Sequence, residues 1–173
     1  MGRDKAWLPF NGKSLVEHTI DLVREAGARE VLISGRAGQD FSGLGCSVLN
    51  DAIPARGPLA GIDRALTGAK HPLVLVLAVD LPHMTSACLR WIASFCNADS
   101  GCIPALRERL EPLAAFYPKV AHGILDGILR LEPPAARRLA AACVERGLAC
   151  RVTVPAAHEV CFSNWNTPED AGI

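Results

Sequence analysis

The stretch Leu73-Val-Leu-Val-Leu-Ala-Val-Asp-Leu-Pro82 places seven apolar residues in succession before a single carboxylate, Asp80. An uninterrupted apolar run rich in Val and Leu is typical of a strand that is covered on both faces. A helix would need more residues than lie between His71-Pro72 and Leu81-Pro82. A strand buried in this way needs helices above and below it, so the stretch predicts a parallel α/β sheet.

Asp80 is expected just beyond the carboxyl end of this strand. In open α/β sheets, ligands bind in the crevice outside the carboxyl ends of the strands. Asp80 is therefore a candidate functional carboxylate. A carboxylate that only caps the following turn is an equally weighted interpretation at this point.

Helices and strands are expected to alternate along the rest of the chain. Ser14 and Glu17 have the spacing of a capping box at the start of a helix, and Gly27 supplies its end. No strand is expected in the first dozen residues. The expected helices are 15–26, one beginning at 57–61, one opened by Thr85, 119–131 and 134–146, and the expected strands are 30–34, 46–49, 101–105, 112–117 and 150–154.

This alternation is the doubly wound pattern, a mostly parallel sheet with helices on both faces, similar to the Rossmann arrangement. No repeat, linker or low-complexity stretch divides the 173 residues. We therefore expect one domain over residues 1–173.

Composition excludes several classes of function. Half of the residues are hydrophobic and 21% are charged, as in an ordinary globular protein. Lys plus Arg equals Asp plus Glu at 18 each, so no basic field favours a nucleic-acid partner. No apolar run approaches the roughly 20 residues that span a bilayer, and no export signal is recognisable. We expect a cytoplasmic protein that binds neither nucleic acid nor membrane.

The cysteines and histidines show no metal-binding spacing. Seven cysteines form no Cys-x-x-Cys pair, and their odd number does not suit a closed disulfide framework. They are expected to be reduced and mostly buried. The cysteines are Cys46, Cys88, Cys96, Cys102, Cys143, Cys150 and Cys161, and the histidines are His18, His71, His83, His122 and His158.

An ordered series of motifs extends over nearly the whole chain. It consists of Met1-Gly-Arg-Asp-Lys-Ala6, Asn50-Asp51 followed by Gly57-Pro-Leu-Ala-Gly61, Val79-Asp-Leu-Pro82, Pro112-Leu-Ala-Ala-Phe-Tyr117 and Asn164-Trp-Asn-Thr-Pro-Glu169. In this order and spacing the motifs resemble those of the molybdenum cofactor guanylyltransferases, within the nucleotidyltransferases of the nucleotide-diphospho-sugar type. The motif at residues 50–61 is the most diagnostic of the series.

The chain departs from the family pattern at both ends. Met1 to Lys5 matches only the second half of the signature Leu-Ala-Gly-Gly-x-Ser-x-Arg-Met-Gly-x-Asp-Lys. The resemblance implies that the first strand and most of the phosphate loop are missing. The sequence also stops three residues after Asp170, which implies a shortened last helix. We expect a nucleotidyltransferase-like domain that is truncated at the amino end and at the carboxyl end.

The resemblance implies a magnesium-dependent transfer of GMP from GTP to molybdopterin bearing molybdenum, with release of pyrophosphate. Such a transfer depends on charge neutralisation and in-line positioning. Asp80 would be catalytic and would hold Mg²⁺, which takes one or two carboxylates beside substrate phosphates. Lys5 would be the second catalytic group, a cation on the triphosphate.

The resemblance also implies two sets of binding residues. Lys5, Ser34, Asp51 and Asp80 would bind the nucleotide, with Ser34 at the position of a base-contacting Asn. The pterin substrate would contact Gly57, Gly61, Asn164 and Asn166. Simpler interpretations stay open for several of them: a turn at Asp51, close packing at Gly61 and a helix N-cap at Asn166.

Two other functions remain compatible with the sequence. The chain could be a cytidylyltransferase or another nucleotidyltransferase of the same fold. It could also be a noncatalytic fragment or binding module, because half of the phosphate loop is absent. GTP and Mo-molybdopterin are the expected partners, with molybdoenzymes or cofactor-delivery proteins as further candidates.

Overall fold

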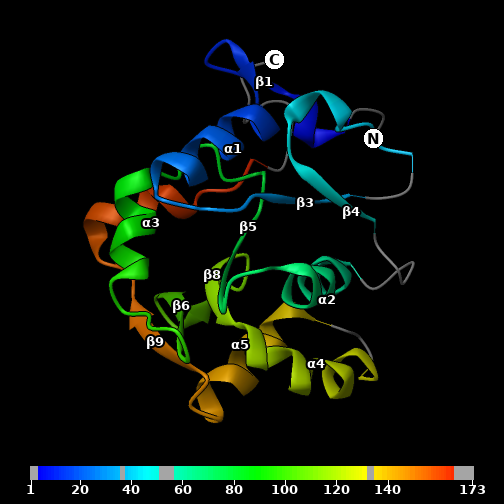
Figure 1. Cartoon of the computed structure of the whole chain (residues 1–173). Helices are drawn as coiled ribbons and strands as arrows, with labels where there is room; N and C mark the ends of the chain where they lie inside the picture. Colours follow the sequence, from blue (N-terminus) through cyan, green and yellow to red (C-terminus); the bar gives the residue numbers. More distant parts are fainter. Residues whose placement is uncertain (1–3, 36–37, 51–56, 132–134, 166–173) are drawn as a thin grey trace.

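The computed structural model describes residues 4–35, 38–50, 57–131 and 135–165 (Figure 1). The helices in this part of the chain are α1 (Leu15–Glu25), α2 (Pro58–Gly68), α3 (Ser86–Ala93), α4 (His122–Leu129) and α5 (Ala136–Glu145), with the 3-10 helices η1 (Lys5–Trp7), η2 (Ser42–Leu44), η3 (Lys119–Ala121) and η4 (Ala156–Phe162). The strands are β1 (Pro9–Phe10), β2 (Lys13–Ser14), β3 (Leu32–Gly35), β4 (Ser47–Asn50), β5 (Leu73–Leu77), β6 (Gly101–Leu106), β7 (Arg109–Leu110), β8 (Ala114–Pro118) and β9 (Ala149–Thr153).

The largest sheet is built around β8 and β6. Strand β8 pairs antiparallel with β5 on one side and with β6 on the other. Strand β6 also pairs in parallel with β9 and antiparallel with the short β7. A separate pair, β3 and β4, is parallel. The predicted α/β class is confirmed, but the described strands form a mixed rather than a mostly parallel arrangement because β8 runs against both of its neighbours.

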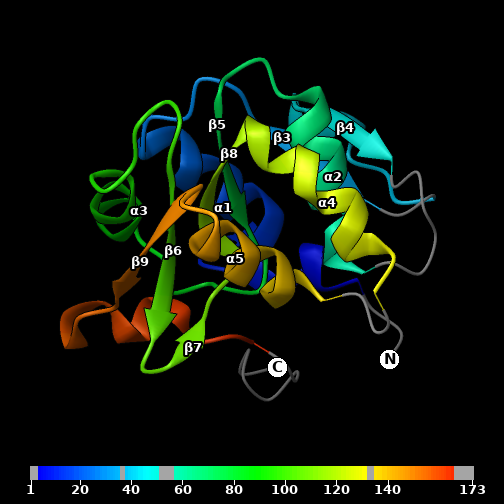
Figure 2. The same ribbon diagram turned by 90° about the horizontal axis from the view of Figure 1, so that it is seen from below.

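Helices cover both faces of the larger sheet, as the sequence predicts (Figure 1 and Figure 2). Ile103 of β6 and Tyr117 of β8 pack with α2, α4 and α5 in one core. Cys102 of β6 and Ala114 of β8 pack with α1 and α3 in a second core. Because successive side chains of a strand point to opposite faces, the same strands contribute side chains to both cores.

Strand β5 is covered on both faces, but one of its edges is open. Of its residues only Val74 is fully buried, and the other four are half-buried. The reason is that the edge of β5 opposite β8 borders a cleft, and no strand among the described residues pairs with it there. The expectation of a strand covered on both faces is confirmed, because Val74 and Val76 pack against one core and Leu75 and Leu77 against the other.

The amino-terminal segment contains a small hairpin where no strand was expected. Strands β1 and β2 pair antiparallel across Asn11 and Gly12, whose φ angles are 48° and 81°. Asn-Gly is a strong signal for a two-residue hairpin turn, and the prediction overlooked it. The hairpin leads directly into α1, where Ser14 and Glu17 form the predicted capping box.

No helix in the described residues is both long and apolar enough to cross a membrane.

Candidate functional site

A large cleft lies between β3 and β5, along edges at which no strand of the described part of the chain pairs. Its volume is about 1850 Å³, and both strands line it along their length. The start of α2 and the helix η1 complete its walls. Five of the residues that sequence analysis assigned to substrates line this one cleft: Lys5, Ser34, Gly57, Gly61 and Asp80.

Lys5 and Asp80 meet at the end of β5. The Lys5 Nζ atom lies 4.0 Å from the Asp80 Oδ2 atom, and the side chains are 42% and 25% exposed. Lys5 is positioned by η1, whose N-cap Asp4 accepts a hydrogen bond of 3.2 Å from the backbone N–H of Ala6. An ammonium group and a carboxylate are thus held together at the opening of the cleft, where both remain accessible to a ligand.

The segment after η4 contacts both residues of this pair through Trp165. Its backbone N–H donates a hydrogen bond of 2.9 Å to the carbonyl of Asp80, and its carbonyl accepts one of 3.0 Å from Lys5 Nζ. The Trp165 ring packs edge-on against Phe10 and His83 at centroid separations of 5.3 and 6.2 Å. Sequence reasoning did not assign Trp165, although its place between two asparagines of one motif marked the segment.

The remaining lining residues come from β3 and α2. Ser34 is exposed on β3. Gly57 is the N-cap of α2 with φ 55° and ψ −145°, a backbone conformation that an L side chain rarely adopts. The amino end of α2 carries the partial positive charge of the helix dipole and lies at the cleft, which favours an anionic ligand.

Three of the predicted residues do not appear among the described residues that line the cleft. Asp51 and Asn166 lie outside the described residues. Asn164 is exposed, immediately before Trp165, and it does not line the cleft.

The arrangement suits a ligand that carries several negative charges and a hard metal ion. Asp80 offers a carboxylate oxygen, Lys5 a point cation, and α2 the amino end of a helix. These three elements face one volume, so one ligand can contact all of them.

Comparisons with known proteins find similar sequences and structures over most of the chain. A family model described as a MobA-like NTP transferase domain matches residues 1–148. A probable molybdenum cofactor guanylyltransferase from Opitutus terrae is 35% identical over 173 residues, covering 98% of this chain and 86% of that protein.

Solved structures show the same fold. Molybdopterin-guanine dinucleotide biosynthesis protein A from Archaeoglobus fulgidus superposes with a TM-score of 0.74 at 22% identity, over 99% of this chain and 88% of that one. The 2-C-methyl-D-erythritol 4-phosphate cytidylyltransferase from Thermus thermophilus superposes with a TM-score of 0.73 at 21% identity, over 97% of this chain and 90% of that one. At these identities the structural likeness establishes the fold and not the substrate.

Proposed function

The chain belongs to the family of MobA-like NTP transferase domains, and on that premise we propose that it transfers GMP from GTP to molybdopterin bearing molybdenum. In this reaction an oxygen of the terminal phosphate of molybdopterin attacks the α-phosphorus of GTP. The bond from that phosphorus to the β-phosphate oxygen breaks, and pyrophosphate leaves. The relative from Opitutus terrae is named a probable molybdenum cofactor guanylyltransferase, which supports this choice of substrates.

The observation that carries the proposal is the position of Lys5 and Asp80. The two residues lie far apart in the sequence, yet their charged atoms are 4.0 Å apart and both residues line the cleft. Nucleotidyl transfer requires positioning and neutralisation of charge more than covalent help from the protein. A carboxylate and a lysine at one cleft are the groups that this chemistry uses.

Asp80 fits the requirements of a magnesium ligand. Its side chain is 25% exposed at the cleft, and Mg²⁺ is bound through one or two carboxylates together with substrate phosphates. A bound Mg²⁺ would supply Lewis-acid polarisation of the phosphoryl oxygens. Asp80 would hold the ion against the triphosphate, and no second protein carboxylate is needed for this role.

Lys5 and the amino end of α2 would bind the phosphates. The three hydrogens of the Lys5 ammonium group can be shared between the Trp165 carbonyl and a phosphate oxygen. Gly57 lets the backbone approach a ligand without a Cβ, and the dipole of α2 favours the negative charge. Together these groups would orient the triphosphate and stabilise the leaving pyrophosphate.

The other predicted contacts remain part of the proposal. Ser34 and Asp51 would bind the nucleoside, and Gly61, Asn164 and Asn166 would contact the pterin substrate. Ser34 and Gly61 line the cleft, which supports their assignment.

The test is pyrophosphate release from GTP in the presence of Mg²⁺ and molybdopterin, for the parent chain and for Asp80→Asn. We expect the substitution to lower turnover by about 100-fold or more, because a charge-stabilising group of the transition state is lost. Stability should change little, since a surface ion pair contributes at most about 1 kcal/mol.

Asp21→Asn is the matched control. Asp21 also pairs with a lysine, Lys13, but it lies on the exposed face of α1 and does not line the cleft. Turnover of Asp80→Asn at the level of Asp21→Asn would refute the role of Asp80. In the same assay the parent chain should use GTP in preference to CTP, whereas preference for CTP would favour the cytidylyltransferase alternative.

A further inference from the structure

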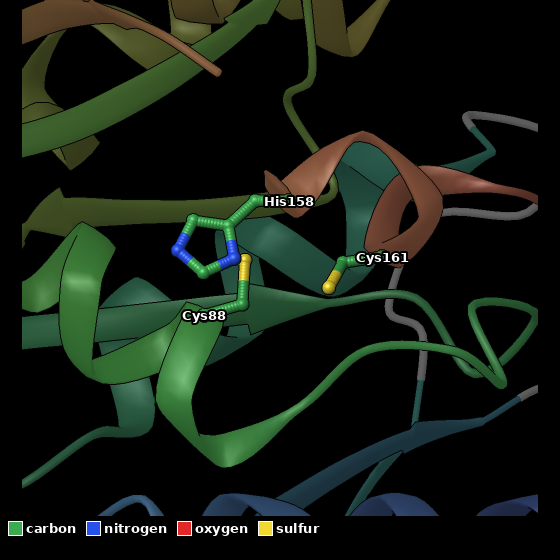
Figure 3. Close-up of side chains that lie close together, drawn as sticks. All are labelled: Cys88, His158 and Cys161. Atoms are coloured by element: carbon green, nitrogen blue, oxygen red, sulfur yellow. The ribbon is translucent and has the colours of Figure 1, made fainter. Parts of the chain in front are cut away.

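Two cysteines and a histidine that are distant in the sequence converge on the side of the molecule where α3 meets η4. Cys88 lies on α3, and His158 and Cys161 lie on η4 (Figure 3). Their ligand atoms all lie within 4.8 Å of one another. Figure 3 shows the three side chains directed into the same space between the two elements.

The burial of the three side chains differs in a way that suits an ion site. Cys88 is fully buried and Cys161 is 3% exposed, whereas His158 is half-buried. The two sulfur atoms are thus shielded from water and from other thiols. The imidazole stands at the surface side, where an ion can enter.

We propose that Cys88, His158 and Cys161 form a binding site for a divalent d¹⁰ metal ion, of which Zn²⁺ is the physiological representative. Thiolate sulfur and imidazole nitrogen are the ligands that zinc uses in proteins. Neither the relatives' names nor the proposed transfer reaction assigns a metal to these residues, and the site is independent of that reaction.

The distances are compatible with tetrahedral coordination after a small movement of side chains. With Zn–S near 2.3 Å and Zn–N near 2.0 Å, ligand atoms of a tetrahedral site are separated by about 3.4–3.8 Å. Contraction from 4.8 Å requires shifts of roughly 1 Å, within the range of cysteine and histidine side-chain rotations. A water molecule at the surface side would complete the four ligands.

The charge balance favours a divalent ion. Zn²⁺ with two thiolates and a neutral imidazole makes a complex of zero net charge. A neutral complex avoids the large cost of burying an uncompensated charge. A monovalent ion would leave one negative charge in this buried place.

An ion at this site would fasten η4 to α3. Helix η4 leads through Ser163 and Asn164 to Trp165, the residue that hydrogen-bonds to both Asp80 and Lys5. Thr85, the N-cap of α3, lies near this junction, with its Oγ1 atom 3.9 Å from Cys161 Sγ. The metal would therefore stabilise the carboxyl-terminal segment that closes on the cleft.

The experiment is titration of the reduced full chain with Co²⁺ and then Zn²⁺. Co²⁺ should give a thiolate-to-metal charge-transfer band and the visible bands of a tetrahedral ion, and one equivalent of Zn²⁺ should abolish them. Cys88→Ser and His158→Ala should each weaken zinc binding by roughly 100-fold or more, since even residues that only orient metal ligands affect affinity 10–100-fold. Zn²⁺ should raise the melting temperature of the parent chain and not of these variants.

Three control variants distinguish this site from other side chains that could bind the metal ion. Cys143→Ser removes an equally buried thiol from the other core, His122→Ala removes an exposed imidazole, and Asp80→Asn removes the carboxylate at the cleft. All three should retain the cobalt spectrum. Because His158 is half-buried, His158→Ala tests the site without disturbing the core. Absence of the charge-transfer band, or zinc affinity of His158→Ala equal to that of the parent, would overturn the proposal.

Discussion

At the scale of the residue, two lysine–aspartate pairs of this chain show that proximity alone does not mark a functional site. Lys13 Nζ and Asp21 Oδ2 are 2.5 Å apart, with the side chains 57% and 51% exposed. Their hydrogen bond raises the pKa of Lys13 and lowers that of Asp21, but water and salt screen such an exposed pair. Lys5 and Asp80 are farther apart, at 4.0 Å, yet they lie at a cleft and at the end of a strand. Their location, rather than their separation, leaves them able to bind a charged ligand.

This contrast predicts different effects for two lysine substitutions. Lys5→Ala should lower GTP-dependent pyrophosphate release by about 100-fold, because a positive charge that stabilises the transition state is removed. Lys13→Ala, the matched control, should leave the rate within about twofold of the parent, because Lys13 does not line the cleft. Melting temperatures should be nearly the same for both variants. Equal rates for the two variants would contradict the role of Lys5.

At the scale of the element, the pairing of β6 with β8 depends on a glycine. A Cβ atom at Gly101 would collide with the backbone carbonyl of Phe116 on β8. Gly101 is also opposite Ala149 of β9, so β6 is fixed from both sides. Backbone atoms of two paired strands cannot move apart without breaking the ladder. Close approach of strands, rather than an unusual φ angle, is thus what requires glycine here.

Gly101→Ala should therefore lower the free energy of unfolding by about 3 kcal/mol or more, the upper part of the range for overpacking. Gly127→Ala is the matched control, because Gly127 lies inside α4 and a Cβ there meets no atom within 4 Å. That variant should be more stable than the parent by about 0.5–1 kcal/mol. Urea unfolding of both variants checks this, and a Gly101→Ala variant as stable as the parent would be inconsistent with the strand spacing described here.

At the scale of the whole molecule, the larger sheet separates two hydrophobic cores. Ile62 of α2 belongs to the core shared with α4 and α5, and Ile92 of α3 belongs to the core shared with α1. Both are at most 1% exposed. The strands β6 and β8 lie between the cores and contribute alternate side chains to each. Changes in one core therefore reach the other only through the backbone of the sheet.

From this separation we expect Ile62→Val and Ile92→Val to act independently. Each should cost about 1 kcal/mol of unfolding free energy through the loss of one buried methylene. The double variant should show the sum of the two losses to within about 0.5 kcal/mol, because the sites share no partners. A coupling energy well above that value in chemical denaturation would mean that the sheet transmits packing changes between the cores.

Local sequence signals predict the order of the elements and most of the chemical groups of the site. The capping box of Ser14 and Glu17, the apolar run before Asp80 and the cap at Thr85 are local signals, and the structure places α1, β5 and α3 at these positions. Local signals suffice because capping and periodicity depend on residues a few positions apart. The motif series likewise pointed to the family that the comparisons establish.

Which of these groups lie close together in space depends on the tertiary fold. The antiparallel course of β8, the cleft between β3 and β5 and the closure of Trp165 on Lys5 and Asp80 follow from contacts between distant parts of the chain. The convergence of Cys88 with His158 and Cys161 has the same origin, and their spacing in the sequence gave no sign of it. The physical reason is that such contacts depend on how strands and helices pack in space, and spacing along the chain does not encode that packing in any simple way.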